Sequence, residues 1–162
     1  MKFILSRKTE FILLLFILCL FCVLAMYRIS SVSLWLDEIM SLDFADEGFS
    51  ELIHNLKEDV HAPLFYIILS WFVDLLGLSV FTGRFVSILF GVGTVFLLFL
   101  YVKKVTDWKT ALISAMLLSL WPMFIEFSRE VHPYSASAFF AVLSWLFFLR
   151  ILKQESRMDF VF

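Results

Sequence analysis

Long apolar runs separated by polar connections make up most of the chain. A polar stretch over 30–61 follows the first run and carries Leu, Ile and Phe at helical spacing among many acidic residues. That spacing predicts an amphipathic helix lying on a membrane surface. The apolar runs have about the length that a helix needs to cross a bilayer. They cover approximately residues 11–27, 63–81, 85–102, 111–127 and 134–149.

The first apolar run is predicted to be a retained membrane span. The competing interpretation is a signal peptide, which would have a shorter apolar core followed by a small-x-small cleavage site. Here Met26-Tyr27-Arg28 follows the run instead.

The distribution of Lys and Arg indicates whether the run over 63–81 crosses the membrane, because these residues accumulate on the cytoplasmic side. The run is ambiguous, since it contains Asp74 and Gly77. If it does not cross, nine of the 13 Lys and Arg residues lie inside and four outside; if it crosses, five lie inside and eight outside. We therefore predict a juxtamembrane or re-entrant helix on the outer face. The same arrangement gathers these charged residues on one side: Asp37, Glu38, Asp74, Arg84, Glu126, Arg129 and Glu130.

The predicted fold is an all-α integral membrane protein with both termini in the cytoplasm. The chain is 62% hydrophobic, contains 21 Phe and has a mean hydropathy of +0.94, whereas soluble domains are nearer half apolar. No basic patch with interleaved aromatic residues is present, so nucleic acid is not an expected ligand. We expect one module over 1–162, with an outer loop and juxtamembrane helices over 30–83 and four spans at about 11–27, 85–102, 111–127 and 134–149.

Metal and redox chemistry receive little support from the sequence. Cys19 and Cys22 lie inside an apolar run without polar neighbours, so they are interpreted as small apolar residues. No two of His54, His61 and His132 have the i, i+4 spacing of a helical zinc pair. A divalent cation held by the carboxylates is the one cofactor that stays open.

Asp37 and Glu38 are the first candidate catalytic residues. They follow the first span by about ten residues, and Trp35 just before them suits a membrane interface. A carboxylate partly shielded from water can serve as a general base. The alternative is a solvated acidic loop that only helps to set the topology.

Arg84 and the segment Arg129–Tyr134 are the second group of candidates. An outward arginine at a helix start opposes the helix dipole and therefore calls for an anionic partner, either an acid of the loop or a phosphate. Arg129 and Glu130 lie between two predicted spans, close to the outer interface, and Tyr134 places a phenol at the same depth. The alternatives are a lipid headgroup contact for Arg84 and an internal ion pair for Arg129 and Glu130.

Four motifs in order resemble the amino-terminal part of GT-C fold membrane glycosyltransferases, in the superfamily of protein O-mannosyltransferases and aminoarabinose lipid A transferases. The likeness covers roughly residues 30 to 150. Ala62, Val86 and His132 depart from the family pattern, where two prolines and an arginine are expected. The motifs are Trp35-Leu36-Asp37-Glu38, His61-Ala62-Pro63-Leu64-Phe65-Tyr66, Gly83-Arg84-Phe85-Val86-Ser87-Ile88-Leu89-Phe90-Gly91 and Ser128 to Tyr134.

The resemblance implies an inverting transfer of a sugar from a polyprenyl-phosphate donor to an acceptor hydroxyl of a lipid or protein. It implies that Asp37 is the base, that Glu38 positions Arg84, and that Glu130 is a second acidic group that orients the donor or a bound cation. Arg84 and Arg129 would stabilise charge on the departing phosphate. The remaining residues that the resemblance assigns to substrate binding are His61, His132 and Tyr134.

The expected location is the plasma (inner) membrane, with the active face outward. Enzymes of this superfamily are several times longer, so we expect a fragment or truncated product with low or no activity in isolation. The alternative is a non-catalytic membrane subunit or scaffold that binds a partner through its acidic outer loop. A transporter fragment is less favoured, because the charges crowd the outer edge rather than the middle of the membrane.

Overall fold

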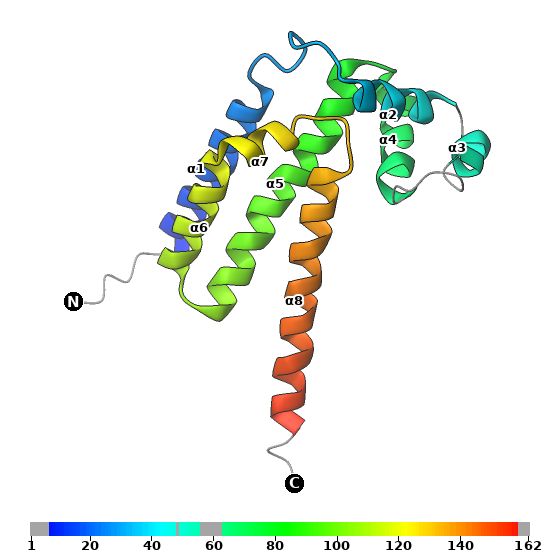
Figure 1. Cartoon of the computed structure of the whole chain (residues 1–162). Coiled ribbons are helices and arrows are strands. Elements are labelled where there is room, and N and C mark those ends of the chain that lie inside the picture. The colour runs from blue at the N-terminus through cyan, green and yellow to red at the C-terminus, as the bar shows by residue number, and fades with distance from the viewer. Residues whose placement is uncertain (1–6, 48, 56–62, 159–162) are drawn as a thin grey trace.

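The computed structural model describes residues 7–47, 49–55 and 63–158, and within these ranges the chain forms eight helices and no strand (Figure 1). The prediction of an all-α membrane fold is confirmed. The helices are α1 (Arg7–Met26), α2 (Leu36–Asp46), α3 (Phe49–Asn55), α4 (Pro63–Leu76), α5 (Val80–Val105), α6 (Trp108–Leu120), α7 (Pro122–Phe127) and α8 (Tyr134–Met158).

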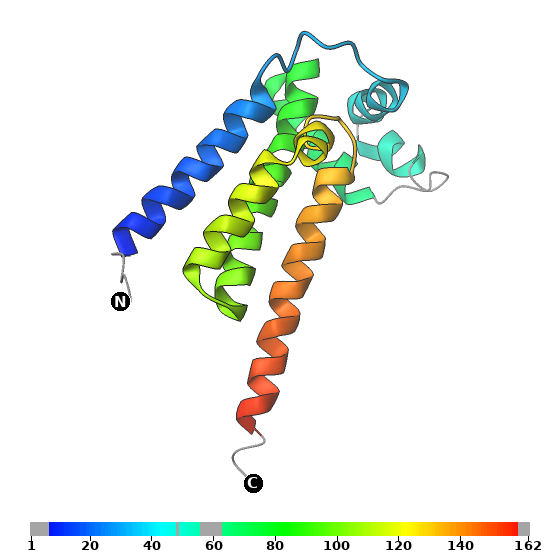
Figure 2. The same cartoon turned by 60° about the vertical axis from the view of Figure 1, so that its left-hand side comes forward.

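The helices α1, α5, α6 and α8 lie side by side and run alternately up and down (Figures 1 and 2). Helix α5 is central, because it packs against α1, α4, α6 and α8. The end of this bundle that carries α2, α7 and the connection 128–133 is at the top of Figure 1, and we call it the upper end. The start of α1, the turn between α5 and α6 and the last turns of α8 lie at the opposite, lower end.

Three of the described helices are long and apolar enough to cross a membrane: α1, α5 and the part of α8 over Tyr134–Leu152. The fourth expected span, over 111–127, is divided into α6 and α7. Trp121 between them has an extended backbone (ψ 116°), because Pro122 cannot donate an N–H and disfavours a helical conformation in the residue before it. The four-span topology stays a prediction in which α6 and α7 together form the fourth pass.

A tight reversal joins α4 to α5. Gly77 follows the last residue of α4 with φ +85°, a conformation that favours glycine, and its N–H donates to the Val73 carbonyl at 2.8 Å. Ser79 then caps α5 by accepting the Thr82 N–H at 3.0 Å. Because of this turn, the 14-residue α4 packs back against α5 and α2. Its length is below that of a span, as is that of α6, and the juxtamembrane or re-entrant position of α4 stays a prediction.

Two apolar cores support the bundle. The first joins α1, α5 and α6, and the second packs α2, α3 and α4 against α5 and the start of α8. The second core holds α2 and α3 at the upper end, so the acidic residues of α2 are positioned by packing as well as by polar contacts. Its buried members are Leu42, Ala45, Leu52, Phe65, Tyr66, Leu69, Val73, Val86, Val131 and Ala136.

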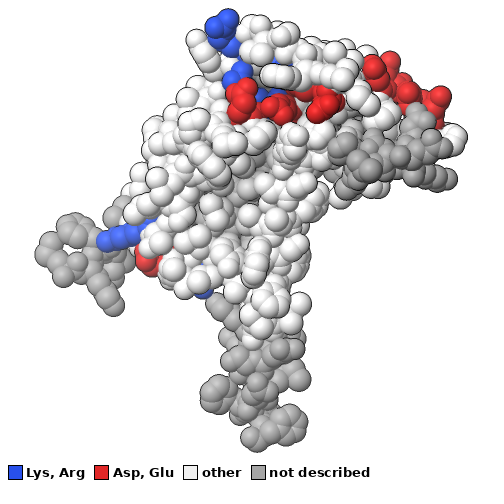
Figure 3. All heavy atoms as spheres, viewed as in Figure 1, with Lys and Arg blue, Asp and Glu red and all other residues white. Residues whose placement is uncertain are grey.

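The two ends also differ in charge. In Figure 3 acidic and basic side chains gather at the upper end, and a broad uncharged band separates them from the lower end. The lower end carries Lys103 and Lys104 in the last turn of α5. An uncharged band of this kind is what a bilayer requires of the surface it covers. Which side of the membrane the upper end faces remains a prediction.

Candidate active site

A buried ion pair between Glu38 and Arg84 forms the centre of the upper end. The Arg84 Nε donates to Glu38 Oε1 at 2.9 Å and Nη2 donates to Oε2 at 2.8 Å, which is a bidentate arrangement. The two side chains are only 2% and 5% exposed. Glu38 lies in the first turn of α2 and Arg84 in the first turns of α5, so the pair ties these helices together.

The remaining donors of Arg84 hold the connection between α1 and α2. Nη1 donates to the backbone carbonyls of Ile29 at 2.5 Å and Val32 at 3.1 Å, and Nη2 donates to the backbone carbonyl of Ser33 at 3.4 Å. A guanidinium has five N–H donors, and the chain itself supplies five acceptors. The expected contact of Arg84 with a phosphate stays a prediction, and it would require one of these bonds to be exchanged.

Glu38 accepts two further bonds from the backbone. The Val131 N–H donates to Oε1 at 3.0 Å, and the Trp35 N–H donates to Oε2 at 3.2 Å. Burial alone would raise the pKa of Glu38, but the bonds from Arg84 and from these two amides outweigh it and hold the pKa below its ordinary value. Glu38 is therefore a fixed carboxylate that joins three distant segments of the chain.

Small residues of α5 let the connection 128–133 approach closely. A Cβ on Gly83 would lie 2.8 Å from a methyl group of Val131 and 2.9 Å from one of Leu42. A Cβ on Gly91 would lie 2.8 Å from the hydroxyl of Ser128. The Val131 amide can reach Glu38 because its side chain occupies the space that Gly83 leaves open.

Arg129 is turned towards the end of α1. Its Nη2 donates to the Tyr27 carbonyl at 2.9 Å, and its Nη1 lies 3.7 Å from Glu126 Oε2. The Tyr27 carbonyl belongs to the groups that a helix end leaves without partners, so Arg129 caps α1. That Arg129 also binds a phosphate stays a prediction. Such a contact would use the N–H donors of Arg129 that the Tyr27 carbonyl and Glu126 do not occupy.

Glu130 differs from Glu38 in having no ion pair among the residues that the structure describes. Burial raises the pKa of Glu130, and the nearby carboxylates of Glu38, Glu126 and Asp37 raise it further, while Arg84 partly opposes them. At the upper end, the pKa of Glu38 is thus lowered and the pKa of Glu130 is raised. Carboxyl groups with pKa values shifted in opposite directions often mark acid–base sites.

The charged side chains of the upper end surround a cavity of about 20 Å³, which has room for roughly one water molecule. A substrate as large as a sugar phosphate would lie over this cavity rather than inside it. The cavity is lined by Val32, Trp35, Glu38, Arg84, Glu126, Arg129 and Glu130.

The other predicted site residues lie around this centre. The Asp37 side chain is exposed, one residue before the buried Glu38. His132 is buried, and its ring lies 4.3 Å from that of Tyr134, whose ring is also 5.0 Å from Phe127. His61 lies outside the described residues. Within the described residues no group of three His, Cys, Asp or Glu has metal-binding geometry, and both cysteines are free.

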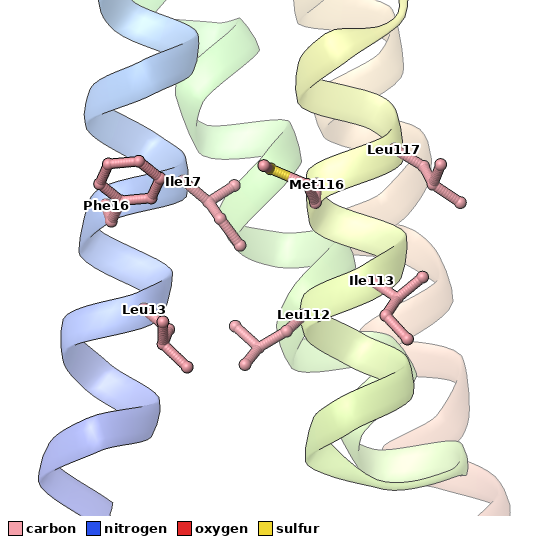
Figure 4. Close-up of a pocket in the computed structure, with 7 residues that line it drawn as sticks. All are labelled: Leu13, Phe16, Ile17, Leu112, Ile113, Met116 and Leu117. Atoms are coloured by element: carbon pink, nitrogen blue, oxygen red, sulfur yellow. The ribbon is translucent and has the colours of Figure 1, made fainter.

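An apolar hollow of about 360 Å³ lies between α1 and α6, away from these charges (Figure 4). Leu13 and Ile17 of α1 face Leu112 and Met116 of α6 across it. It offers no acid, base or hydrogen-bonding side chain, so it does not compete with the upper end as a catalytic site.

Sequence comparison identifies the protein family to which the chain belongs. A family model of dolichyl-phosphate-mannose-protein mannosyltransferase matches residues 60–162, which is more than half of the chain. The chain belongs to this family. It is a mannosyltransferase-like glycosyltransferase module of a membrane, in agreement with the resemblance of its motifs. Searches of curated proteins and of solved structures gave no match.

The mannosyltransferase match includes Arg84 and the connection 128–133 and begins after Trp35–Glu38. The ion pair between Glu38 and Arg84 therefore connects the matched part of the chain to the acidic motif before it. Sequence reasoning missed the parts of this site that are backbone groups: the carbonyls of Tyr27, Ile29, Val32 and Ser33, and the amides of Trp35 and Val131.

Proposed function

We propose that this chain forms part of a site that transfers a sugar from a polyprenyl-phosphate donor to an acceptor hydroxyl on the outer face of the membrane. One observation carries this proposal: Glu38, Arg84, Arg129 and Glu130 meet at one small cavity, and the exposed Asp37 is close enough to act on Glu130. These residues come from segments that are up to 93 positions apart in the chain.

Asp37 is the proposed general base. Its carboxylate takes the proton of the acceptor hydroxyl while the hydroxyl oxygen forms a bond to the anomeric carbon of the sugar. The bond between that carbon and the phosphate oxygen breaks, and the electron pair leaves with the lipid phosphate. Attack from the side opposite the phosphate inverts the anomeric centre. A positioned base of this kind contributes about 10²- to 10⁴-fold in rate.

Glu38 and Arg84 support this step without direct contact with the acceptor. Their ion pair fixes the first turn of α2, which carries Asp37. The positive charge of Arg84 lies at the cavity, and Arg129 adds a second one, so both favour the charge that develops on the departing phosphate. The donor would approach sideways from the bilayer, because its lipid portion stays among the apolar helices.

The test is Asp37→Asn, with Asp43→Asn as the matched control. Both residues are exposed aspartates of α2, and the two substitutions remove the same charge. In membranes that contain the complete enzyme of which this chain is proposed to form a part, we expect Asp37→Asn to lower sugar transfer by about 100-fold or more without changing protein abundance. Asp43→Asn should retain transfer. If several acids of α2 and α3 instead share a loss in small steps, a scaffold that binds its partner through the acidic loop is the better description.

A further inference from the structure

We propose that Glu130 takes up a proton when a phosphate anion binds beside it, so that the neutral carboxyl group donates a hydrogen bond to the phosphate. This inference rests on the proposed function, because it assumes that the ligand of the upper end carries a phosphate. It assigns Glu130 a role as a proton-linked binding residue, in addition to the acidic character that its sequence indicates.

The first argument is the balance of charge around the cavity. Three carboxylates line it, from α2, α7 and the connection 128–133, against two guanidinium groups. Asp37 of α2 is a fourth acid close enough to act on Glu130. An anion that arrives here meets more negative than positive charge. Neutralising one carboxyl group of the lining leaves two carboxylates against two guanidinium groups there.

The second argument is that one of the two cations, Arg84, is fully engaged and the other, Arg129, is partly engaged. Arg84 gives all five of its N–H donors to Glu38 and to backbone carbonyls. Arg129 donates to the Tyr27 carbonyl and lies beside Glu126. Arg84 therefore has no donor left for a phosphate. Arg129 keeps some, and a protonated carboxyl group beside it supplies a further donor.

The third argument is that Glu130 is the carboxyl group best placed to change its state. Glu38 is fixed as a carboxylate by four donated hydrogen bonds. Glu126 has a side chain that is 63% exposed and lies near Arg129, so water and a cation stabilise its charge. Glu130 has neither an ion pair in the described part of the chain nor full hydration, and its pKa is already raised. A phosphate would raise that pKa further.

The groups that face Glu130 set the direction of the pH dependence. They are Asp37 and Glu38 from α2, Glu126 from α7 and Arg84 from α5. Arg129 and His132 lie one and two residues from Glu130 in the chain. Because binding takes up a proton, affinity for the anion should fall as pH rises above the pKa of Glu130 in the free protein. One coupled proton gives at most a tenfold loss of affinity per pH unit.

The experiment measures binding of methyl farnesyl phosphate to the full chain in detergent micelles between pH 4 and pH 8. This probe is a phosphodiester, so it lacks the ionisation near pH 6 that a phosphate monoester has. Farnesol is the uncharged reference ligand. We expect affinity of the unmodified protein for the phosphodiester, relative to farnesol, to fall with rising pH. Calorimetry in two buffers with different ionisation enthalpies should show proton uptake of up to one per ligand.

The variants separate Glu130 from its neighbours. Glu130→Gln should bind the phosphodiester with little dependence on pH and more tightly than the unmodified protein at pH 8. Glu126→Gln removes the same charge from the same cluster and should keep the pH dependence, as should the conservative Glu130→Asp. If Glu130→Gln does not fold, proton uptake by the unmodified protein and the behaviour of Glu126→Gln still decide the question.

Several results would overturn the inference. One is an affinity that does not depend on pH, and another is a pH dependence that survives in Glu130→Gln or disappears in Glu126→Gln. These outcomes leave the proposed glycosyltransferase site in place. If the unmodified protein binds the phosphodiester no better than farnesol at any pH, both the inference and the proposed phosphate site fail.

Discussion

Among the residues that the structure describes, an ion pair joins two helices at each end of the bundle, and these two pairs differ in burial. At the upper end, Glu38 and Arg84 are 2% and 5% exposed and make a bidentate contact. At the lower end, Glu10 of α1 pairs with Lys103 of α5, and these side chains are 15% and 43% exposed. A buried pair needs every donor and acceptor satisfied, whereas an exposed pair shares its groups with water.

This difference shows where the fold holds polar groups in place. At the lower end, the turn into α6 relies on Asp107, which accepts the N–H groups of Lys109 and Thr110. Bonds from Thr110 and Lys109 hold the pKa of Asp107 below its ordinary value. These contacts are local in sequence. The upper end, in contrast, joins distant segments through a buried polar network. A site that must orient reacting groups needs such rigidity.

The largest expected difference between the two ends is the compartment that they face. With Cys19 and Cys22 replaced, single cysteines at the exposed positions Asp37 and Lys104 test it. We expect a membrane-impermeant thiol reagent to label position 37 in intact cells, and to label position 104 only after the cells are opened. Labelling of position 104 alone in intact cells would reverse the proposed orientation. Labelling of both would place the ends on the same side, in conflict with a spanning bundle.

The next largest effect should follow from Glu38→Gln. The substitution keeps the size of the side chain and leaves Arg84 as a buried charge without its counterion, which costs about 3–5 kcal/mol. Thermal unfolding in detergent, followed by tryptophan fluorescence, would show a large loss of stability.

The unmodified protein gives a second measurement of the same carboxylate. Because the pKa of Glu38 is lowered in the folded state, its stabilising contribution is present above the ordinary glutamate pKa of about 4.3 and is lost as pH falls through the lowered value. Stability that is the same in Glu38→Gln as in the unmodified protein would contradict the buried pair.

The smallest effect should follow from Glu10→Gln at the lower end. This pair is partly exposed, so its loss should cost no more than about 1 kcal/mol, and less at high salt. The same unfolding measurement at low and high salt checks it. A loss as large as that of Glu38→Gln would mean that the lower end is as strongly coupled as the upper one.

Much of this arrangement was predictable from the sequence, for identifiable reasons. Apolar run length predicted the all-α membrane fold. The bias of Lys and Arg placed Glu38, Arg84 and Glu130 at one end, where the structure also has them. The division at Pro122 carried a local signal, but the high hydropathy of 111–127 favoured a single span.

The details of the site had no comparable signal. Any residue can supply a backbone carbonyl, so the sequence does not show that Arg84 binds Ile29, Val32 and Ser33. The same holds for the Val131 amide on Glu38 and for the Tyr27 carbonyl that Arg129 caps. Gly83 was recognised as part of a motif, but its function as a space for Val131 depends on packing between segments far apart in the chain.

The bond between the Val131 amide and Glu38 also has a consequence for biosynthesis. Its two partners are 93 residues apart, and Arg84 lies between them at a separation of 46 from Glu38. At ordinary rates of translation, about 5–20 residues per second, Glu38 is made roughly 5–20 s before Val131. During that interval the acidic helix has already been synthesised while its last partner does not yet exist. Until the connection before α8 has been made, Glu38 therefore lacks one of its four hydrogen-bond donors.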